Sequence, residues 1–305
     1  MVRSIYSARF FVIQDHTGTS TERRQNAGIA QGCPLSPYLF IAVQTVMLHD
    51  AIDSLHLEEE PGYVVTRDVL YADDTLLVSQ HQSNLQNMLN AIIEEGRNYG
   101  LELNWGKTVQ MQISTNQKVT TPSGSEIKTV RDAVYLGGLL TCDGRASAEL
   151  CRRLGEASKL FKQLNKLWSH ASLGWRRKRR IYDSVVLSKL LYSLDSLWSL
   201  KADRCRLDAF HCRCLRRILG IPHSFISRIS NTSVLDQAGA EPLSQVLAGR
   251  QTKLYQKIVA YGPAALVNRI LCNGDGSPKN WARKRRRGRP RRQWASSDYN
   301  LLLHV

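Results

Sequence analysis

The chain has 305 residues, of which 43% are hydrophobic, so it can form two domains and bury a core. Its formal net charge of +16 at pH 7 indicates a polyanionic partner, with nucleic acid the leading candidate. No apolar run reaches the length of a membrane span, so we expect no membrane partner. The seven cysteines lack the spacing of a disulfide framework, which indicates reduced thiols in an intracellular protein.

The first elements are expected to be short strands followed by a helix. Residues Arg9–Gln14 read as a strand, Asp15–Gly18 as a turn, and the polar run after it as the returning strand. A Gly/Pro-rich segment, Gly28–Pro37, then leads into a helix with Ser36 at its N-cap and Pro37 at its first position. The helix is expected to carry an apolar stripe of Phe40, Val43 and Met47.

The next feature is a pair of adjacent carboxylates between two predicted strands. Residues 63–70 and 75–79 are rich in β-branched and apolar side chains, and Asp73 and Asp74 fall where the chain must turn. Two adjacent carboxylates repel each other unless a cation neutralises them, which favours a divalent-metal site. An ordinary Asp-containing β-turn explains the same residues equally well.

A strongly amphipathic helix follows, because apolar residues recur at helical spacing in Leu85, Met88, Leu89, Ile92 and Ile93. We expect Ser83 to cap this helix and Gly100 to lie near its end. Short strands are expected around residues 107–114 and 133–140. From Ser147 onward the pattern predicts successive helices, one of which covers 207–219 and stops at Gly220.

Four blocks along the first half of the chain carry a family resemblance: Gln31–Pro37, Tyr71–Asp74, Gly100–Thr108 and Tyr135–Gly138. In this order and spacing they resemble the palm of a reverse transcriptase, and the similarity is greatest to the polymerases of LINE-type, non-LTR retrotransposons. Looser similarity continues through residues 206–221 and 287–294.

The resemblance implies an α+β fold. A partial polymerase palm, an antiparallel sheet with packed helices, is expected over residues 1–145. A helical thumb-like region would cover residues 146–222, a helical post-thumb region 223–270, and a basic disordered tail 271–305.

The resemblance also assigns expected roles. Asp73 and Asp74 would bind Mg²⁺ or Mn²⁺ in a two-metal nucleotidyl transfer to a primer 3′-hydroxyl, with the metals about 3.5–4 Å apart. Lys107 would serve as a third catalytic group near the departing pyrophosphate. The expected partners are an RNA template, a DNA primer and deoxynucleoside triphosphates. The nucleotide and template would lie against Gln31, Gly32, Tyr71 and Ala72, and the primer against Tyr135, Leu136, Gly137 and Gly138.

Each of these roles has a simpler alternative. Lys107 reads equally well as a solvated strand lysine, and Gly32 as the opening of a helix. Residues Tyr135–Gly138 also fit an ordinary core strand with a glycine bulge.

Two basic blocks are expected to contact a nucleic-acid backbone. The first runs without interruption through Arg176, Arg177, Lys178, Arg179 and Arg180 at the start of a predicted helix. The second contains Arg287, Arg289 and Arg291 and resembles an AT-hook core that enters the DNA minor groove. A nuclear-import role or a general phosphate-binding role is an alternative for the second block. From this basic tail we expect a nuclear protein.

The family's first palm block supplies another metal-binding aspartate, and the sequence before Gln31 contains no convincing equivalent. We reject Asp15 because it lies in a predicted turn only 16 positions upstream. The chain is therefore expected to be an N-terminally truncated polymerase fragment that lacks the fingers and is incomplete for catalysis alone. The alternatives are a catalytically inactive nucleic-acid-binding remnant and a product that never folds stably. The oligomeric state is left open.

One cysteine-rich cluster is interpreted as structural. Cys205, His211, Cys212 and Cys214 are close in sequence, but Cys212 and Cys214 point to different faces of a helix. The spacing does not suit tetrahedral zinc, so helix packing is the preferred interpretation.

Overall fold

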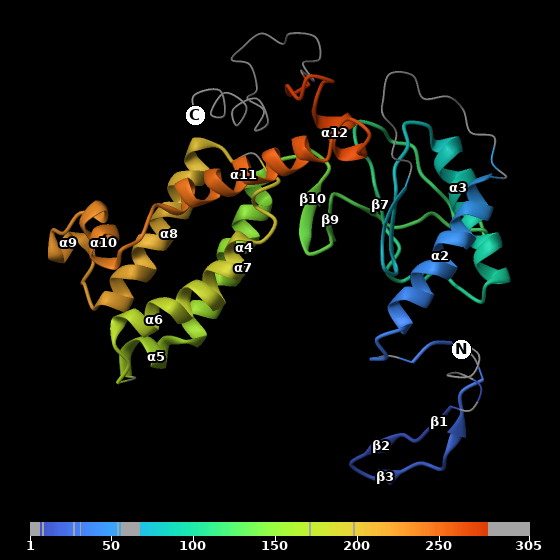
Figure 1. Cartoon of the computed structure of the whole chain (residues 1–305), viewed down its shortest axis with the longest axis horizontal. Coiled ribbons are helices and arrows are strands. Elements are labelled where there is room, and N and C mark those ends of the chain that lie inside the picture. Colours follow the sequence, from blue (N-terminus) through green and yellow to red (C-terminus); the bar gives the residue numbers. More distant parts are fainter. Residues whose placement is uncertain are drawn as a thin grey trace. The chain divides into compact units, whose positions relative to one another are not determined.

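The computed structural model describes residues 7, 9–26, 28–30, 32–53, 55, 68–170, 172–197 and 199–279. The chain mixes helices with small sheets, which is consistent with an α+β fold (Figure 1). It divides into two compact units: a first unit of residues 1–61, 67–108 and 119–126, and a second of 62–66, 109–118 and 127–305. Gln31, Tyr63–Arg67 and the basic block with Arg287, Arg289 and Arg291 lie outside the described residues.

The first unit begins with two short antiparallel strand pairs. β1 (Phe10–Phe11) pairs with β4 (Arg23–Arg24), and β2 (Gln14–Asp15) pairs with β3 (Gly18–Thr19). The predicted turn at Asp15–Gly18 is thus present and joins β2 to β3.

Two helices and one hairpin form the core of the first unit. α2 (Ser36–Asp53) packs against α3 (Gln82–Asn98), and the hairpin consists of β5 (Asp68–Tyr71) and β6 (Asp74–Leu77). The buried apolar residues of this core are Met47, Leu48, Ala51 and Ile92, with Leu77 packed against them.

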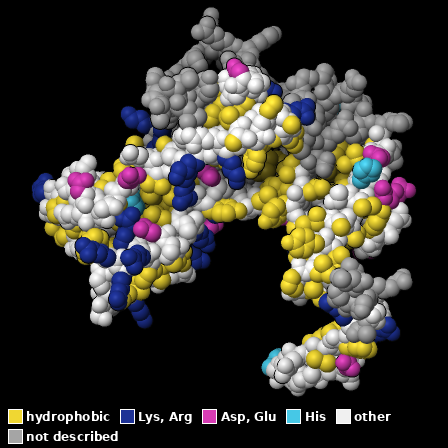
Figure 2. Space-filling view, in the orientation of Figure 1, with side chains coloured by type: hydrophobic (Ala, Val, Ile, Leu, Met, Phe, Trp, Pro, Cys, Tyr) yellow, Lys and Arg dark blue, Asp and Glu magenta, His cyan; other side chains and the backbone are white. Residues whose placement is uncertain are grey.

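The predicted apolar stripe of α2 is only partly correct. Met47 is buried, but the side chain of Val43 is 41% exposed, because the helix turns Gln44, Leu48 and Ala51 inward instead. Tyr38, Ile41 and Val46 are also exposed, and Figure 2 shows the resulting apolar surface over α2. The sequence misleads here because α2 is apolar almost all round, so its composition does not select one face.

The start of α3 also differs from the prediction. The helix begins at Gln82 and its N-cap is His81, so Ser83 lies within the first turn. The backbone N–H of His81 is instead bound by the Ser79 hydroxyl, at 3.1 Å. The buried face of α3 includes Met88, Leu89 and Ile92, as the helical spacing predicts.

The second unit contains two further strand pairs. β7 (Gln110–Met111) and β8 (Thr129–Val130) are parallel, whereas β9 (Asp132–Tyr135) and β10 (Gly138–Thr141) form an antiparallel hairpin. The strand predicted over residues 133–140 is therefore two strands. Leu136 and Gly137 make the turn between them, with φ of 49° and 76°. Two consecutive positive φ values are typical of a type I′ hairpin turn, so neither a continuous strand nor a glycine bulge describes this segment.

Helices dominate the rest of the second unit. In chain order they are α4 (Ala146–Gln163), α5 (Asn165–His170), α6 (Trp175–Ile181), the π-helix η1 (Tyr182–Leu187), α7 (Ser188–Leu191), α8 (Lys201–Leu219), α9 (Ser224–Ser227), α10 (Asn231–Ala238), α11 (Leu243–Ala260) and α12 (Leu266–Leu271). α8 begins earlier than predicted but ends at Gly220 as expected, with φ of 72° in the left-handed region that favours glycine. Among the described helices, none combines the length and apolar character needed to cross a bilayer.

The core of the second unit is one large cluster to which α4, α5, η1, α7, α8, α10 and α11 contribute. Cys212 and Cys214 are buried in this cluster, which supports the interpretation that they pack rather than bind metal. Burial raises the pKa of both thiols, that of Cys214 to about 12, so both remain protonated at neutral pH. Cys205 is exposed and does not share their environment.

Candidate functional site

The carboxylate pair sits at the turn of the β5–β6 hairpin. Tyr71 pairs with Asp74, which leaves Ala72 and Asp73 as a two-residue loop. Ala72 has a φ of 52°, whereas Asp73 is not among the described residues with positive φ, a pattern typical of a type II′ turn. An L-residue in this region is strained by about 1–2 kcal/mol relative to glycine, so the surrounding structure must hold the turn.

Helix α2 supports the hairpin from one side. The Gln44 amide donates to the Thr75 hydroxyl over 3.5 Å, and Leu77 packs against the α2–α3 core. Asp73 and Asp74 themselves are exposed, so both carboxylates can reach a solvent-borne cation. The hairpin is therefore anchored at its strands and open at its tip.

The donor set suits Mg²⁺ or Mn²⁺ but is incomplete. Carboxylate oxygens are the ligands that these hard cations prefer. Within the described part of the chain, however, no three His, Cys, Asp or Glu side chains come together in a group that could hold a metal ion. Two adjacent aspartates thus fit part of a metal site, and a two-metal centre needs further ligands.

Asp15 has a structural role. Its Oδ1 accepts hydrogen bonds from the Thr17 N–H at 2.7 Å, the Thr17 hydroxyl at 2.5 Å and the Gly18 N–H at 3.2 Å. The Thr17 hydroxyl and N–H lower the pKa of the Asp15 carboxyl, despite a small opposing effect of desolvation. The carboxylate therefore closes the β2–β3 turn.

Two other predicted site residues lie in the first unit. Gly32 has a φ of 85°, a conformation that favours glycine, just before α2. Lys107 is exposed and closes a turn through its own N–H, which donates to the Asn104 carbonyl over 3.0 Å.

The predicted primer-contacting hairpin, Tyr135–Gly138, lies in the second unit and is held at its turn by α4. Arg152 Nη2 donates to the Gly137 carbonyl over 2.7 Å, and Arg153 Nη2 donates to the same oxygen. Both guanidinium groups also bind Glu149, whose side chain is 1% exposed, through bonds of 2.7 Å. A buried carboxylate thus orients two arginines onto one turn carbonyl.

The same turn packs closely against the chain after α7. The Tyr192 hydroxyl donates to the Leu136 carbonyl over 3.0 Å. A side chain on Gly137 would meet the Tyr192 ring at 3.2 Å, and one on Gly138 would meet the Ser193 hydroxyl at 3.0 Å. Close packing therefore favours glycine at both positions, and the positive φ of Gly137 favours it there as well.

The cationic block on α6 divides into two kinds of residue. Lys178 is buried and its ammonium donates to the Trp168 carbonyl over 2.8 Å, while Arg179 Nε pairs with Asp183 Oδ1 at 2.7 Å. Arg176, Arg177 and Arg180 are exposed. Figure 2 shows Lys and Arg side chains on the surface of the second unit where α5 and α6 lie in Figure 1. Three of the five predicted contacts with a nucleic-acid backbone are thus accessible.

Cys33 has a thiol of lowered pKa that the sequence analysis missed. The N–H of Leu35 and then the guanidinium of Arg9 lower the pKa of its thiol from 9.0 to about 7. Arg9 Nη2 lies 3.9 Å from Cys33 Sγ. The contact with Arg9 could not be read from the local sequence, because the arginine is 24 residues away.

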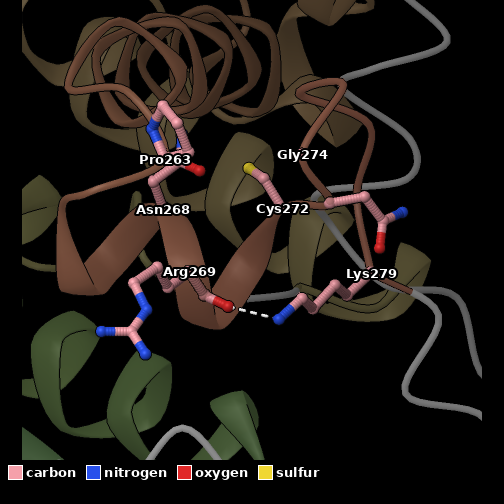
Figure 3. A pocket seen from close by; sticks show the side chains of 7 residues that line it. Pro263, Asn268, Arg269, Cys272, Gly274 and Lys279 are labelled. Atoms are coloured by element: carbon pink, nitrogen blue, oxygen red, sulfur yellow. Dashed lines mark hydrogen bonds between the residues drawn. The ribbon is translucent and has the colours of Figure 1, made fainter.

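A pocket of about 260 Å³ near the end of the described chain has a structural explanation (Figure 3). Lys279 and Arg269 both line it, but the Lys279 ammonium donates to the Arg269 carbonyl at 2.5 Å. A cation at the carboxyl end of α12 offsets the partial negative charge of its last carbonyls. The lysine therefore closes the loop after α12, and the pair does not define an anion site.

Comparison with known proteins finds similarity to one protein family over the first part of the chain. Residues 1–140 match the family described as reverse transcriptase (RNA-dependent DNA polymerase). A transposon-derived protein of Caenorhabditis elegans is 26% identical over 156 residues, covering 50% of this chain and 56% of that protein. The chain therefore spans about half the length of this relative. Residues 1–140 are thus similar to the reverse transcriptase family, and half of the chain is similar to a transposon-derived protein.

Proposed function

We propose that this chain is part of the RNA-directed DNA polymerase of a retrotransposon of the LINE (non-LTR) type. The observation that carries the proposal is the pair Asp73 and Asp74 at the tip of an anchored hairpin, within the residues that match the reverse transcriptase family. The reaction is nucleotidyl transfer to a primer 3′-hydroxyl. The partners are an RNA template, a DNA primer or target and deoxynucleoside triphosphates.

In this proposal Asp73 and Asp74 bind Mg²⁺ or Mn²⁺, and Lys107 acts near the leaving pyrophosphate. The nucleotide and template lie against Gln31, Gly32, Tyr71 and Ala72. The primer lies against the β9–β10 turn, where two arginines and a tyrosine hold the carbonyls of Leu136 and Gly137. Residues 1–145 would act as a palm and the helices after them as a thumb.

We further propose that the chain does not complete the reaction by itself. The described residues supply two exposed carboxylates and no third group close enough to join them in a metal site. A catalytically inactive nucleic-acid-binding protein is therefore the second candidate. The exposed arginines on α6 favour it, together with the basic C-terminal block, which we propose also directs the protein to the nucleus.

Primer extension on an RNA template separates the two candidates. The full chain is compared with its Asp73→Ala variant in the presence of Mg²⁺, and a parallel assay measures binding of the same primer–template. Incorporation that depends on Asp73 supports an active polymerase. Equal background incorporation from both proteins, with primer–template binding retained, supports the inactive binding protein. Loss of both activities in the unaltered chain contradicts both candidates.

A further inference from the structure

Two adjacent apolar side chains on α9 (Ser224–Ser227) project into solvent in the second unit (Figure 1). Phe225 is 81% exposed and Ile226 is 70% exposed, and Phe225 has the largest exposed fraction of the large hydrophobic residues in the described part of the chain. Burial of a side chain of this size would stabilise the fold, and the chain forgoes that stabilisation at two consecutive positions. Such exposure indicates a surface that contacts another molecule.

The segment that carries these two side chains is fixed to the core on both sides. Ile221 and Ile229, which flank α9, pack against the large core cluster of the second unit. The buried guanidinium of Arg216 donates to the carbonyls of Pro222 and Ile229 over 3.3 and 2.7 Å. The two apolar side chains of α9 are therefore held outward by an anchored turn.

Arg228 places a positive charge beside the Phe225 ring. The guanidinium carbon Cζ lies 5.9 Å from the ring centroid, within the range of cation–π attraction. Arg228 has a φ of 57°, in the left-handed region that is unfavourable for residues other than glycine. Backbone strain of this kind is frequent at functional segments. Because Phe225 is so exposed, most of its ring surface remains accessible to a ligand.

The stretch of chain around α9 is basic. Residues 209–235 contain four arginines and no aspartate or glutamate. Three of the four arginines are exposed: Arg213, Arg217 and Arg228. The first acidic residues on either side are Asp208, whose carboxylate binds Ser244, and Asp236 in the last turn of α10. An apolar surface in this setting is complementary to a negatively charged partner.

A partner that suits this surface combines flat apolar faces with negative charge. Nucleic acid has both, because its bases stack on aromatic rings and its phosphates are attracted by arginines. In a duplex the faces of the bases are stacked on one another, so only unpaired bases can use an exposed phenyl ring. An apolar peptide would fit Phe225 and Ile226 but would make no use of the local positive charge.

We propose that α9 is a stacking platform for single-stranded nucleic acid. An unpaired base stacks on the Phe225 ring beside the guanidinium of Arg228, and Ile226 contacts the edge of the same nucleotide. The proposal rests on the nucleic-acid binding proposed for this chain, and it adds where an unpaired strand binds. The platform lies outside the residues that match the reverse transcriptase family.

Fluorescence anisotropy of the full chain with a labelled DNA oligonucleotide of about 12 nucleotides tests the proposal, because single-strand sites span about 4–16 nucleotides. The same oligonucleotide annealed to its complement is the duplex probe. We expect Phe225→Ala to weaken single-strand binding by about fivefold or more and to leave duplex binding unchanged. Phe225→Trp keeps an aromatic face and should restore single-strand binding. Neither substitution removes a charge, so the salt dependence of the affinity should stay the same.

Tyr261 provides the matched control. It is 56% exposed in the same unit, and Lys257 Nζ lies 5.9 Å from its ring centroid, so it resembles Phe225 in exposure and in its neighbouring cation. Tyr261→Ala should leave single-strand binding unchanged. A third probe carries abasic sites in place of its bases, so nothing can stack on the ring. On this probe the unaltered chain and Phe225→Ala should bind equally.

The proposal is overturned if Phe225→Ala binds the single strand as tightly as the unaltered chain, which would leave the apolar pair to a protein partner. It is also overturned if Phe225→Ala weakens duplex or abasic binding as much as single-strand binding, or if Tyr261→Ala has the same effect. In each of these cases the unaltered chain still binds nucleic acid, so its proposed function stands. If the unaltered chain binds none of the probes, the proposed nucleic-acid binding and the platform both fail.

Discussion

Cys33 shows how a few contacts can change the chemistry of a side chain. Its thiol follows Gly32 in the segment proposed to border the nucleotide, and the Leu35 N–H and Arg9 lower its pKa to about 7. The thiolate is the reactive form, so we expect alkylation of Cys33 to rise with pH through a midpoint near 7. Mass spectrometry of peptides after brief iodoacetamide treatment measures this midpoint.

Arg9→Gln is the informative variant for this prediction. The substitution removes one of the two main causes of the lowered pKa of Cys33. The alkylation midpoint should therefore move upward toward the ordinary thiol value of 9.0. The exposed Cys205 serves as an internal reference in the same digest. If Cys33 and Cys205 share one pH profile, the arginine contact does not form in solution.

The residue scale also shows what local sequence can and cannot predict. The turn at Asp73 and Asp74 was predicted because its signal is local: two apolar runs flank a pair of turn-forming residues. The contact between Cys33 and Arg9 was missed because the two residues are 24 positions apart in sequence. The same holds for Lys178, whose ammonium is buried against the Trp168 carbonyl although its neighbours Arg176 and Arg177 are exposed. A run of like charges does not reveal which member turns inward.

At the scale of elements, Glu149 joins α4 to the β9–β10 hairpin. Replacement by Gln leaves Arg152 and Arg153 without a buried counter-charge, so we expect the free energy of unfolding at pH 7 to fall by about 3–5 kcal/mol. Glu156→Gln on the same helix is the matched control. Its carboxylate is 34% exposed, so a loss within about 1 kcal/mol is expected. Urea unfolding followed by circular dichroism measures both.

The carboxylate of Glu149 should also make the free energy of unfolding depend on pH. Burial alone would raise the pKa of Glu149, but the hydrogen bonds and charges of Arg152 and Arg153 outweigh it and hold the pKa below 4.5. Stability from this group is therefore complete above pH 4.5 and is lost as the pH falls through the folded-state value. The deficit of Glu149→Gln should shrink below pH 4.5. A deficit that stays constant down to pH 3 would show that the carboxylate has no depressed pKa.

Arg216 joins α8 to the segment that contains α9 and α10. It is 6% exposed, and its two terminal nitrogens donate to four acceptors: Pro222 O, Ser227 Oγ, Ile229 O and Asn231 Oδ1. A lysine keeps the charge but not the planar fork, so Arg216→Lys should lower the free energy of unfolding by about 2–3 kcal/mol. The exposed Arg213 on the same helix is the control, and Arg213→Lys should change it by less than about 0.5 kcal/mol. Similar urea midpoints for the two variants would contradict this role for Arg216.

Helices and strands were predicted well where the apolar residues follow one clear periodicity. They were predicted poorly where contacts between residues distant in sequence determine the local conformation. The apolar spacing of α3 predicted its buried face, and Gly220 predicted the end of α8. The β9–β10 segment read as one strand because Leu136 is an unusual residue for a turn with positive φ. Only the hydrogen bonds from Tyr192, Arg152 and Arg153, all distant in sequence, explain why the chain turns there.

At the scale of the whole molecule, the net charge of +16 predicts binding to nucleic acid, and the structure indicates which cations are available for it. Arg176, Arg177 and Arg180 are exposed on α6, whereas Lys178 and Arg179 are engaged within the protein. Each arginine–phosphate contact releases counterions, so the logarithm of the affinity should fall linearly with the logarithm of the salt concentration. Each contact contributes about 0.9 to the steepness of that slope. Replacing all three exposed arginines by Gln should therefore reduce that slope by about 2–3.

The control for this prediction removes the same charge elsewhere. Arg228, Lys253 and Lys257 are exposed in the same unit and lie outside α6, so their triple Gln variant has an identical net charge. Fluorescence anisotropy with a labelled RNA–DNA duplex at several salt concentrations measures both slopes on the full chain, so the basic C-terminal block is present in each. If the bound backbone follows α6, only the first variant loses slope. Equal loss in both would mean that the protein attracts nucleic acid through its overall charge, and that the five-residue run at 176–180 marks no particular contact surface.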